Sequence, residues 1–211
     1  MIKIGRMILG MYQTNCYFLY REGSDKCIVI DPPDSGDRIC DALEKNGFTV
    51  EAVLLTHAHF DHIWGVEGLV ERSGAKLYAL DAEQGLCESA RDNMSKWAGR
   101  PCTVKPDVYL RDGQEKTLAG MTFRVIETPG HTAGSCCYYF EEPGFLVSGD
   151  TLFLESTGRT DFPTGSTSQI VRSIREKLFV LPNETKVYPG HGDSTTIEHE
   201  KKYNPFVAEE A

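Results

Sequence analysis

Short apolar or alternating segments recur along the chain, separated by glycine, proline and polar residues. Alternation, as in residues 122–126, is typical of a strand with one buried face, whereas a continuous apolar run such as residues 52–56 is typical of a fully buried strand. By these criteria we predict strands at residues 2–9, 15–20, 26–31, 52–56, 76–80, 122–126, 135–140, 145–148 and 186–188.

Apolar residues at helical spacing predict helices between these strands. Ile39, Ala42 and Leu43 form the apolar stripe of a helix at residues 35–46, which Gly47 ends in the C′ position. Further helices are predicted from residue 61 or 62 to residue 72, and at residues 81–90, 168–178 and 196–202. The mixture of strands and helices predicts an α/β or α+β fold, and the length is typical of one domain spanning residues 1–211.

The overall charge limits the classes of partner that we expect. The chain has 31 acidic and 22 basic residues, a net charge of −9 and no run of Lys or Arg, so we expect no nucleic-acid partner and no anionic membrane partner. No stretch reaches the roughly 18 apolar residues of a membrane span, and the first residues do not form a secretory signal. Seven cysteines without a Cys-x-x-Cys pair favour reduced thiols and a cytoplasmic location.

Candidate chemistry concentrates directly after the apolar run at residues 52–56. There the chain reads His-Ala-His-Phe-Asp-His at residues 57–62, which puts three imidazoles and a carboxylate within six residues. Neutral imidazole and carboxylate are suitable ligands for Zn, Fe and Mn. The segment therefore predicts a metal-dependent active site at the end of a buried strand.

Three later residues have similar surroundings. His131, Asp150 and His191 each lie next to a glycine, shortly after a predicted strand, and glycine permits the tight turns that bring backbone close to a metal. An isolated histidine in such a turn is more often an ordinary loop residue, but together with segment 57–62 these residues make a ligand set large enough for two metal ions. Of the six histidines only His199 lies outside these loops, in a polar helical stretch typical of the surface.

The ordered motif, from His57-x-His59-x-Asp61-His62 through His131 and Asp150 to His191, resembles that of the metallo-β-lactamase superfamily over residues 14–192. Three shorter motifs make the chain most similar to the short glyoxalase II-like hydrolases: Asn15-Cys16-Tyr17, Gly158-Arg159-Thr160-Asp161-Phe162 and Asn204-Pro205-Phe206. The resemblance implies a four-layer αβ/βα sandwich, the metallo-β-lactamase fold, with the metal site at one edge between two sheets.

The resemblance also implies a role for each motif residue. It implies two divalent cations, with zinc expected and iron or manganese as alternatives. The ligands of the first cation would be His57, His59 and His131, those of the second Asp61, His62 and His191, and Asp150 would bridge the two. A hydroxide that bridges the cations, with Asp61 and Asp150 as catalytic carboxylates, would then hydrolyse a small-molecule thioester such as a hydroxyacylglutathione. Asp31 and Thr56 are candidates to orient the histidines.

The sequence leaves other activities open. Mono-iron persulfide dioxygenases are similar in size and motifs, and this chain could form their two-histidine, one-carboxylate triad from His57, His131 and Asp150. A lactonase or β-lactamase is less favoured, and a non-catalytic metal-binding module is disfavoured because no ligand position is substituted. Full-length glyoxalase II enzymes carry a further helical domain that helps bind glutathione. Too few residues follow His191 for that domain, so glutathione specificity stays open, as does the oligomeric state. We expect Arg159 and Asp161 to form a structural ion pair that fixes the loop below the site, with contact to the substrate as the less favoured alternative.

Overall fold

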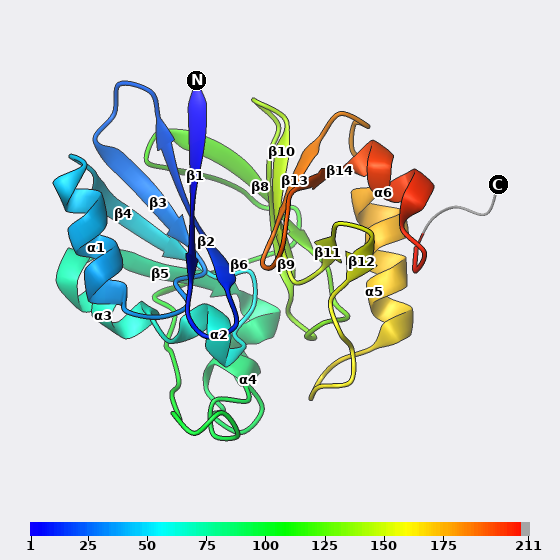
Figure 1. The fold of residues 1–211 in the computed structure, drawn as a ribbon, viewed down its shortest axis with the longest axis horizontal. Coiled ribbons are helices and arrows are strands. Elements are labelled where there is room, and N and C mark those ends of the chain that lie inside the picture. The colour runs from blue at the N-terminus through cyan, green and yellow to red at the C-terminus, as the bar shows by residue number, and fades with distance from the viewer. Residues whose placement is uncertain (208–211) are drawn as a thin grey trace.

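Two six-stranded β-sheets face each other, and helices cover their outer sides, which gives four layers in the order helices, sheet, sheet, helices (Figure 1). The computed structural model describes residues 1–207. The layers confirm the αβ/βα sandwich predicted from the sequence.

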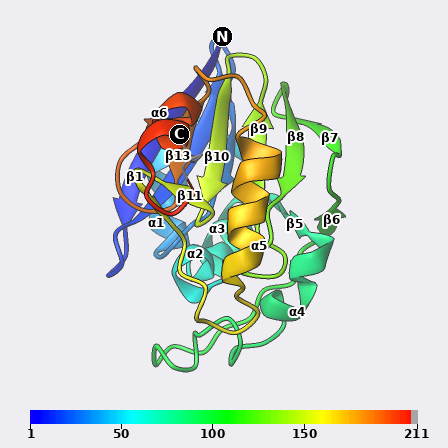
Figure 2. The same cartoon turned by 90° about the vertical axis from the view of Figure 1, so that its right-hand side faces the viewer.

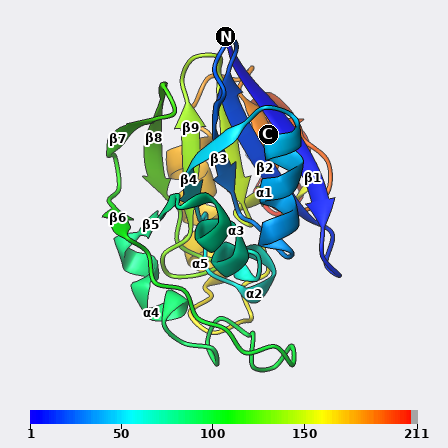
Figure 3. The ribbon, with the colours of Figure 1, turned by 90° about the vertical axis from the view of Figure 1, so that its left-hand side faces the viewer.

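The first sheet contains β1 (Ile2–Leu9), β2 (Thr14–Arg21), β3 (Lys26–Ile30), β4 (Thr49–Leu54), β5 (Lys76–Leu80) and β6 (Val108–Leu110), in that spatial order. Strands β1 to β3 are antiparallel, whereas β3 to β6 run parallel to one another, so the carboxyl ends of these four strands share one edge of the sheet. Helices α1 (Gly36–Lys45) and α3 (Val66–Ser73) cover the outer face (Figure 3).

The second sheet has the order β14-β13-β10-β9-β8-β7. Its strands are β7 (Glu115–Leu118), β8 (Met121–Glu127), β9 (Cys136–Phe140), β10 (Phe145–Gly149), β13 (Lys186–Pro189) and β14 (Thr195–Thr196). Helices α5 (Thr167–Ser173) and α6 (Ile197–Tyr203) lie on its outer side (Figure 2). A small hairpin of β11 (Leu152–Phe153) and β12 (Ser156–Thr157) follows β10, and the short helices α2 (Phe60–Ile63) and α4 (Gln84–Cys87) follow β4 and β5.

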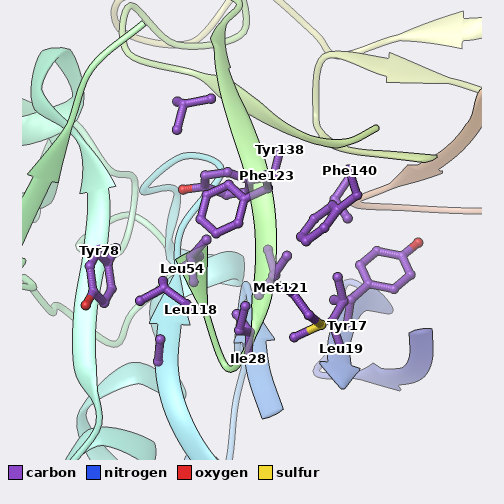
Figure 4. Packing of buried hydrophobic residues seen from close by; sticks show 14 of the residues in the cluster. Tyr17, Leu19, Ile28, Leu54, Tyr78, Leu118, Met121, Phe123, Tyr138 and Phe140 are labelled. Carbon is purple, nitrogen blue, oxygen red and sulfur yellow. The ribbon is translucent and has the colours of Figure 1, made fainter. Parts of the chain in front are cut away.

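Alternation along the central strands builds the core. Leu54 of β4 and Tyr138 of β9 point into the space between the sheets, while their neighbours Val53 and Tyr139 point to the outer helices. Figure 4 shows the aromatic and aliphatic side chains that fill the space between the sheets, with the Phe123 ring 5.4 Å from that of Tyr138. Burial on both faces explains why these strands are apolar throughout.

Buried hydrogen bonds join the two sheets at the carboxyl end of β4. The Tyr138 hydroxyl donates to the carbonyl of Leu55 at 2.6 Å, and the Cys136 amide donates to the carbonyl of Thr56 at 2.9 Å. Both carbonyls belong to the residues directly before segment 57–62. The position of that segment is therefore tied to the second sheet as well as to its own.

The structure corrects several predicted elements. The helix predicted up to residue 72 is broken at Gly65, whose amide donates to the carbonyl of Pro32 at 3.0 Å instead of continuing the helical hydrogen bonds. A Cβ atom at this position would lie 2.9 Å from the same carbonyl oxygen, which explains the glycine. The helix predicted at 81–90 begins as a 3₁₀ turn (Asp81–Glu83) and ends at Cys87, and the one predicted at 168–178 changes to a π-helical turn over Ile174–Leu178. The strands that were not predicted, β6, β7, β11, β12 and β14, are too short to show a period.

Two further expectations concern cysteines and membranes. All seven cysteines are free thiols, as predicted, and most are buried. Within residues 1–207, no helix combines the length and the apolar character that crossing a membrane requires.

Tyr138→Phe tests the link between the sheets. The variant keeps the ring in the core but removes the hydroxyl donor to Leu55, so we expect the free energy of unfolding to fall by about 1–3 kcal/mol in urea denaturation. Tyr139→Phe, on the opposite face of the same strand, is the matched control and should change stability less. Equal effects of the two substitutions would contradict a linking role for Tyr138.

Candidate metal centre

The residues predicted to bind metal all follow strands that end at the same edge of the sandwich. Segment 57–62 follows β4, and His131, Asp150 and His191 follow β8, β10 and β13. Strand β10 is parallel to β13, and both β8 and β10 are antiparallel to β9. The carboxyl ends of β8, β10 and β13 therefore lie together, facing the end of β4 in the first sheet (Figure 1).

The predicted side chains converge in two groups. His57, His59 and His131 form one group and Asp61, His62 and His191 the other, and within each group the potential ligand atoms lie within 4.8 Å of one another. Asp31, which was not predicted as a ligand, forms a third group of this kind with His57 and His62. Asp150 lies between the two predicted groups. Its Oδ1 is 3.4 Å from Nε2 of His62, and its Oδ2 is 3.6 Å from Nε2 of His131 and 3.5 Å from Nε2 of His191. All seven predicted residues thus meet at one centre.

Asp31 and Thr56, the candidates that the sequence offered, orient two of the histidines. Asp31 accepts hydrogen bonds from the amide and the hydroxyl of Thr56, at 2.8 and 2.6 Å, and from Nδ1 of His62 at 3.0 Å. The Thr56 hydroxyl has one hydrogen, which goes to Asp31, so at 3.2 Å it accepts from Nδ1 of His57. Both rings therefore carry a proton on Nδ1 and turn Nε2 toward the centre.

Backbone carbonyls orient two more rings. Nδ1 of His131 donates to the carbonyl of Arg159 at 2.6 Å, and Nδ1 of His191 donates to the carbonyl of Tyr12 at 3.2 Å. Nε2 of His131 then faces Nδ1 of His59 at 2.8 Å. Sequence reasoning missed these two partners because a carbonyl gives no side-chain signal.

The pKa shifts divide the histidines into two kinds. Burial and neighbouring imidazoles hold the pKa of His57 well below its usual value and lower that of His59 to about 3, so both rings are neutral. For His62, burial also acts to lower the pKa, but Asp150, Asp31 and Asp61 outweigh it and raise the pKa well above the usual value. Burial would raise the pKa of Asp150, but the positive charges of His62 and His191 hold it well below its usual range.

Unpartnered polar atoms show that this centre suits a cation. Within residues 1–207, the buried side-chain atoms without a hydrogen-bond partner include Nε2 of His57, Nε2 of His62 and Oδ1 of Asp150. Leaving one buried polar atom unpaired costs about 1–3 kcal/mol, and here several cluster in one place. Imidazole nitrogens with carboxylate oxygens are a donor set for divalent transition metals.

Glycine is required next to the centre. A Cβ atom on Gly190 would lie 2.2 Å from Oδ1 of Asp150 and 2.8 Å from Cε1 of His62. No side chain fits there unless the candidate ligands move. This close approach explains the glycine directly before His191.

Aromatic and charged side chains lie beside the two groups of ligands. The Phe162 ring is 5.4 Å from that of His59, and the guanidinium of Arg159 lies 4.0 Å from the Phe162 ring centre. Arg159 also donates to Asp161 at 2.7 and 2.6 Å, which confirms the predicted ion pair. The Tyr12 ring packs edge-on against Phe60 at 5.1 Å.

Comparison with known proteins identifies the family. The family model of the Metallo-beta-lactamase superfamily matches residues 9–191. The probable metallo-hydrolase YqgX of Bacillus subtilis is 36% identical over 208 residues, covering 98% of each chain. The hydroxyacylglutathione hydrolase GloC of Haemophilus influenzae is 30% identical over 199 residues, covering 93% of each chain.

Solved structures agree with this identification. The BLEG-1 B3 metallo-beta-lactamase is 38% identical with a TM-score of 0.92, over 97% of this chain and 99% of that one. TTHA1623 in a di-iron-bound form is 34% identical with a TM-score of 0.85, over 96% and 99%. The chain therefore belongs to the metallo-β-lactamase superfamily and carries the histidine-rich metal site of a metal-dependent hydrolase.

Proposed function

We propose that this protein is a binuclear metal-dependent thioester hydrolase. His57, His59 and His131 would hold the first cation, Asp61, His62 and His191 would hold the second, and the carboxylate of Asp150, which lies between the two groups, would serve both. The observation that carries the proposal is the position of Asp150, whose oxygens lie 3.4–3.6 Å from Nε2 atoms of both groups. A single site would not need a carboxylate between two sets of three ligands.

The protein groups prepare the site for hydrolysis. Two divalent cations held there would lower the pKa of a bound water to about 7 and polarise a carbonyl oxygen. Neutral His57 and His59 offer lone pairs without losing a proton, and the ionised Asp61 and Asp150 balance the positive charge. Asp150 and Asp61 can also accept hydrogen bonds from the attacking water and so orient it.

A protein nucleophile is not needed for this reaction. Burial raises the pKa of the Cys27 thiol to about 12 and that of Cys137 to about 11, so both are protonated at neutral pH. A thioester suits the site because its leaving thiolate needs little proton assistance. The similarity over 93% of each chain to the hydroxyacylglutathione hydrolase GloC supports a hydroxyacyl thioester as the substrate.

We infer zinc as the resident metal, with iron or manganese accepted by the same donor atoms. The similarity to TTHA1623, seen in a di-iron-bound form, supports two cations per chain. His57, His131 and Asp150 are also a two-histidine, one-carboxylate triad that could hold a single iron, so a persulfide dioxygenase is the alternative activity.

Metal analysis combined with activity assays tests the proposed function. Purified protein should contain two divalent metals per chain and hydrolyse S-lactoylglutathione. His59→Ala should lose the first cation and lower kcat/KM by more than about 100-fold, beyond the effect typical of residues that only orient ligands. His199→Ala, a histidine on α6 paired with Glu155 away from the centre, is the matched control and should keep both properties.

Three outcomes would contradict the proposal. One iron per chain with oxygen uptake on glutathione persulfide would assign the alternative activity. Hydrolysis of a β-lactam but of no thioester would assign a lactamase. Near-normal turnover of His59→Ala would show that the first cation is not needed for hydrolysis.

Proton release on metal binding should depend on pH. The carboxylates hold the pKa of His62 and His191 above the usual histidine value, so these rings stay protonated up to a higher pH than free histidine. A cation must displace those protons, so metal affinity should fall as the pH falls through the raised pKa values, with proton release near pH 7. Calorimetric zinc titration in two buffers of different ionisation enthalpy measures the released protons. His199→Ala should release the same number, and zinc binding without proton release would refute the assignment of His62 and His191.

Gly190→Ala should disturb the shared carboxylate. Because the new methyl group would displace Asp150 and His62, we expect bound metal to fall below two per chain and activity to fall by about 10–100-fold. Gly85→Ala, where a Cβ atom meets nothing within 4 Å, is the control. A Gly190→Ala protein with two metals and wild-type activity would show that the close approach is unimportant.

A further inference from the structure

A buried glutamate beside the metal centre has no part in the proposed mechanism. Glu83 lies in the 3₁₀ turn (Asp81–Glu83) after β5, and its side chain is 2% exposed. Its Oε1 accepts from the amide of Ala58 at 2.8 Å, and its Oε2 accepts from the amide of Gly134 at 3.0 Å. The Thr132 hydroxyl lies 3.0 Å from both oxygens. One carboxylate therefore receives three donors.

These donors belong to the two loops that supply the first group of candidate ligands. Ala58 lies between His57 and His59 in the loop of the first sheet. Thr132 and Gly134 follow His131 in the loop of the second sheet. Glu83 therefore connects the loops across the junction of the sheets, next to the three histidines that would hold the first cation.

The hydroxyl groups around Glu83 use their hydrogen-bonding capacity within one network. If the Thr132 hydroxyl gives its hydrogen to Glu83, the Ser135 hydroxyl donates to Thr132 at 2.8 Å and accepts from the Thr132 amide at 3.1 Å. The loop after His131 is thus organised around the carboxylate. Close packing reinforces this arrangement, because a Cβ atom on Gly134 would lie 2.3 Å from the backbone nitrogen of Glu83.

Burial of this carboxylate is costly. Burial raises the pKa of Glu83 to about 7, although the donors from Ala58, Thr132 and Gly134 favour its ionised form. An apolar side chain of similar volume would avoid that cost. Bonds at the end of β4, from Tyr138 to Leu55 and from Cys136 to Thr56, already join the sheets. Holding the two sheets together therefore does not explain why a carboxylate is buried at this position. Its place between the two loops that carry candidate ligands does explain it.

We propose that Glu83 is a positioning residue that fixes the distance between the loop of His57 and His59 and the loop of His131, and so sets the geometry of the first cation site. The identity of that site rests on the proposed function, whereas the connection between the loops does not. The hydrogen-bond donors to Glu83 are the amides of Ala58 and Gly134 and the hydroxyl of Thr132, so it acts on the candidate ligands through the loops that carry them.

Glu83→Gln is the direct test, since it keeps the shape of the side chain. The amide group replaces one acceptor oxygen with an NH₂ donor, which opposes the donors of Gly134 or Ala58. We expect stepwise Co²⁺ titration to show a first-site affinity lowered by about 10–100-fold, with an altered visible absorption spectrum for that site, while the second site changes less.

Glu200→Gln is a matched control. Glu200 is fully buried in the outer layer of the second sheet and also accepts three hydrogen bonds, from Thr195 Oγ1 at 2.5 Å, the Glu155 amide at 2.9 Å and Asn204 Nδ2 at 2.8 Å. The control should lower the free energy of unfolding in urea by an amount similar to Glu83→Gln, yet leave Co²⁺ affinities and spectrum unchanged.

The outcomes separate this proposal from the proposed function. Wild-type Co²⁺ affinity and spectrum in Glu83→Gln would overturn the positioning role, as would an equal loss of affinity in Glu200→Gln. If the wild-type protein hydrolyses no thioester but Glu83→Gln still weakens metal binding selectively, the proposed function fails and the positioning role stands. If Glu83→Gln does not fold, Thr132→Val decides, because it removes one donor from the same network. Weaker first-site binding in that variant would support the role, and unchanged binding would overturn it.

Discussion

The chemistry of this protein depends on one constraint, which is that loops from two separate sheets must meet in a small buried volume. Segment 57–62 comes from the first sheet, whereas His131, Asp150 and His191 come from the second. Neither sheet alone offers a complete set of ligands for either cation. A small sliding movement of one sheet over the other would therefore separate the ligands. The buried bonds from Tyr138, Cys136 and Glu83 all lie at the junction where such a movement would be felt.

Electrostatics imposes a second condition on the same volume. Several imidazole rings lie close together, with centroids 4.1 Å apart for His57 and His62 and 4.6 Å apart for His59 and His131. Their mutual repulsion when charged, added to burial, keeps His57 neutral, whereas carboxylates keep His62 charged. The site thus holds both ready lone pairs and a local negative charge that attracts cations. Its hydrogen-bond partners fix which nitrogen carries each proton, so the ligands are oriented before a cation arrives.

The mixture of strands and helices and the candidate ligand residues could be predicted from the residue pattern, because both leave clear signals, whereas the four layers were implied by the resemblance to the metallo-β-lactamase superfamily. The long strands show as apolar runs such as residues 52–56, and the ligands are residue types that rarely cluster in a plain core. The break at Gly65 could not be predicted, since it arises from the packing of its backbone against Pro32, which is distant in sequence. The carbonyls of Tyr12 and Arg159 carry no residue signature at all. Glu83 left a weak signal, since it follows a buried strand as the ligands do, but one glutamate after a strand is usually a turn residue.

Substrate choice must be decided outside the metal centre. A thioester and a β-lactam both present a carbonyl group, and the candidate ligands of this chain can meet either in the same way, so these residues cannot discriminate between them. Discrimination requires side chains that contact the substrate beyond its carbonyl group. Phe162, against the ring of His59, and Tyr12, whose carbonyl orients His191, are each attached to one group of ligands. Changes in these side chains can leave the orientation of the ligands intact, because the bonds to His131 and His191 come from the backbone. Because the backbone orients these ligands, the side chains beside them can differ between hydrolases that share the same metal centre.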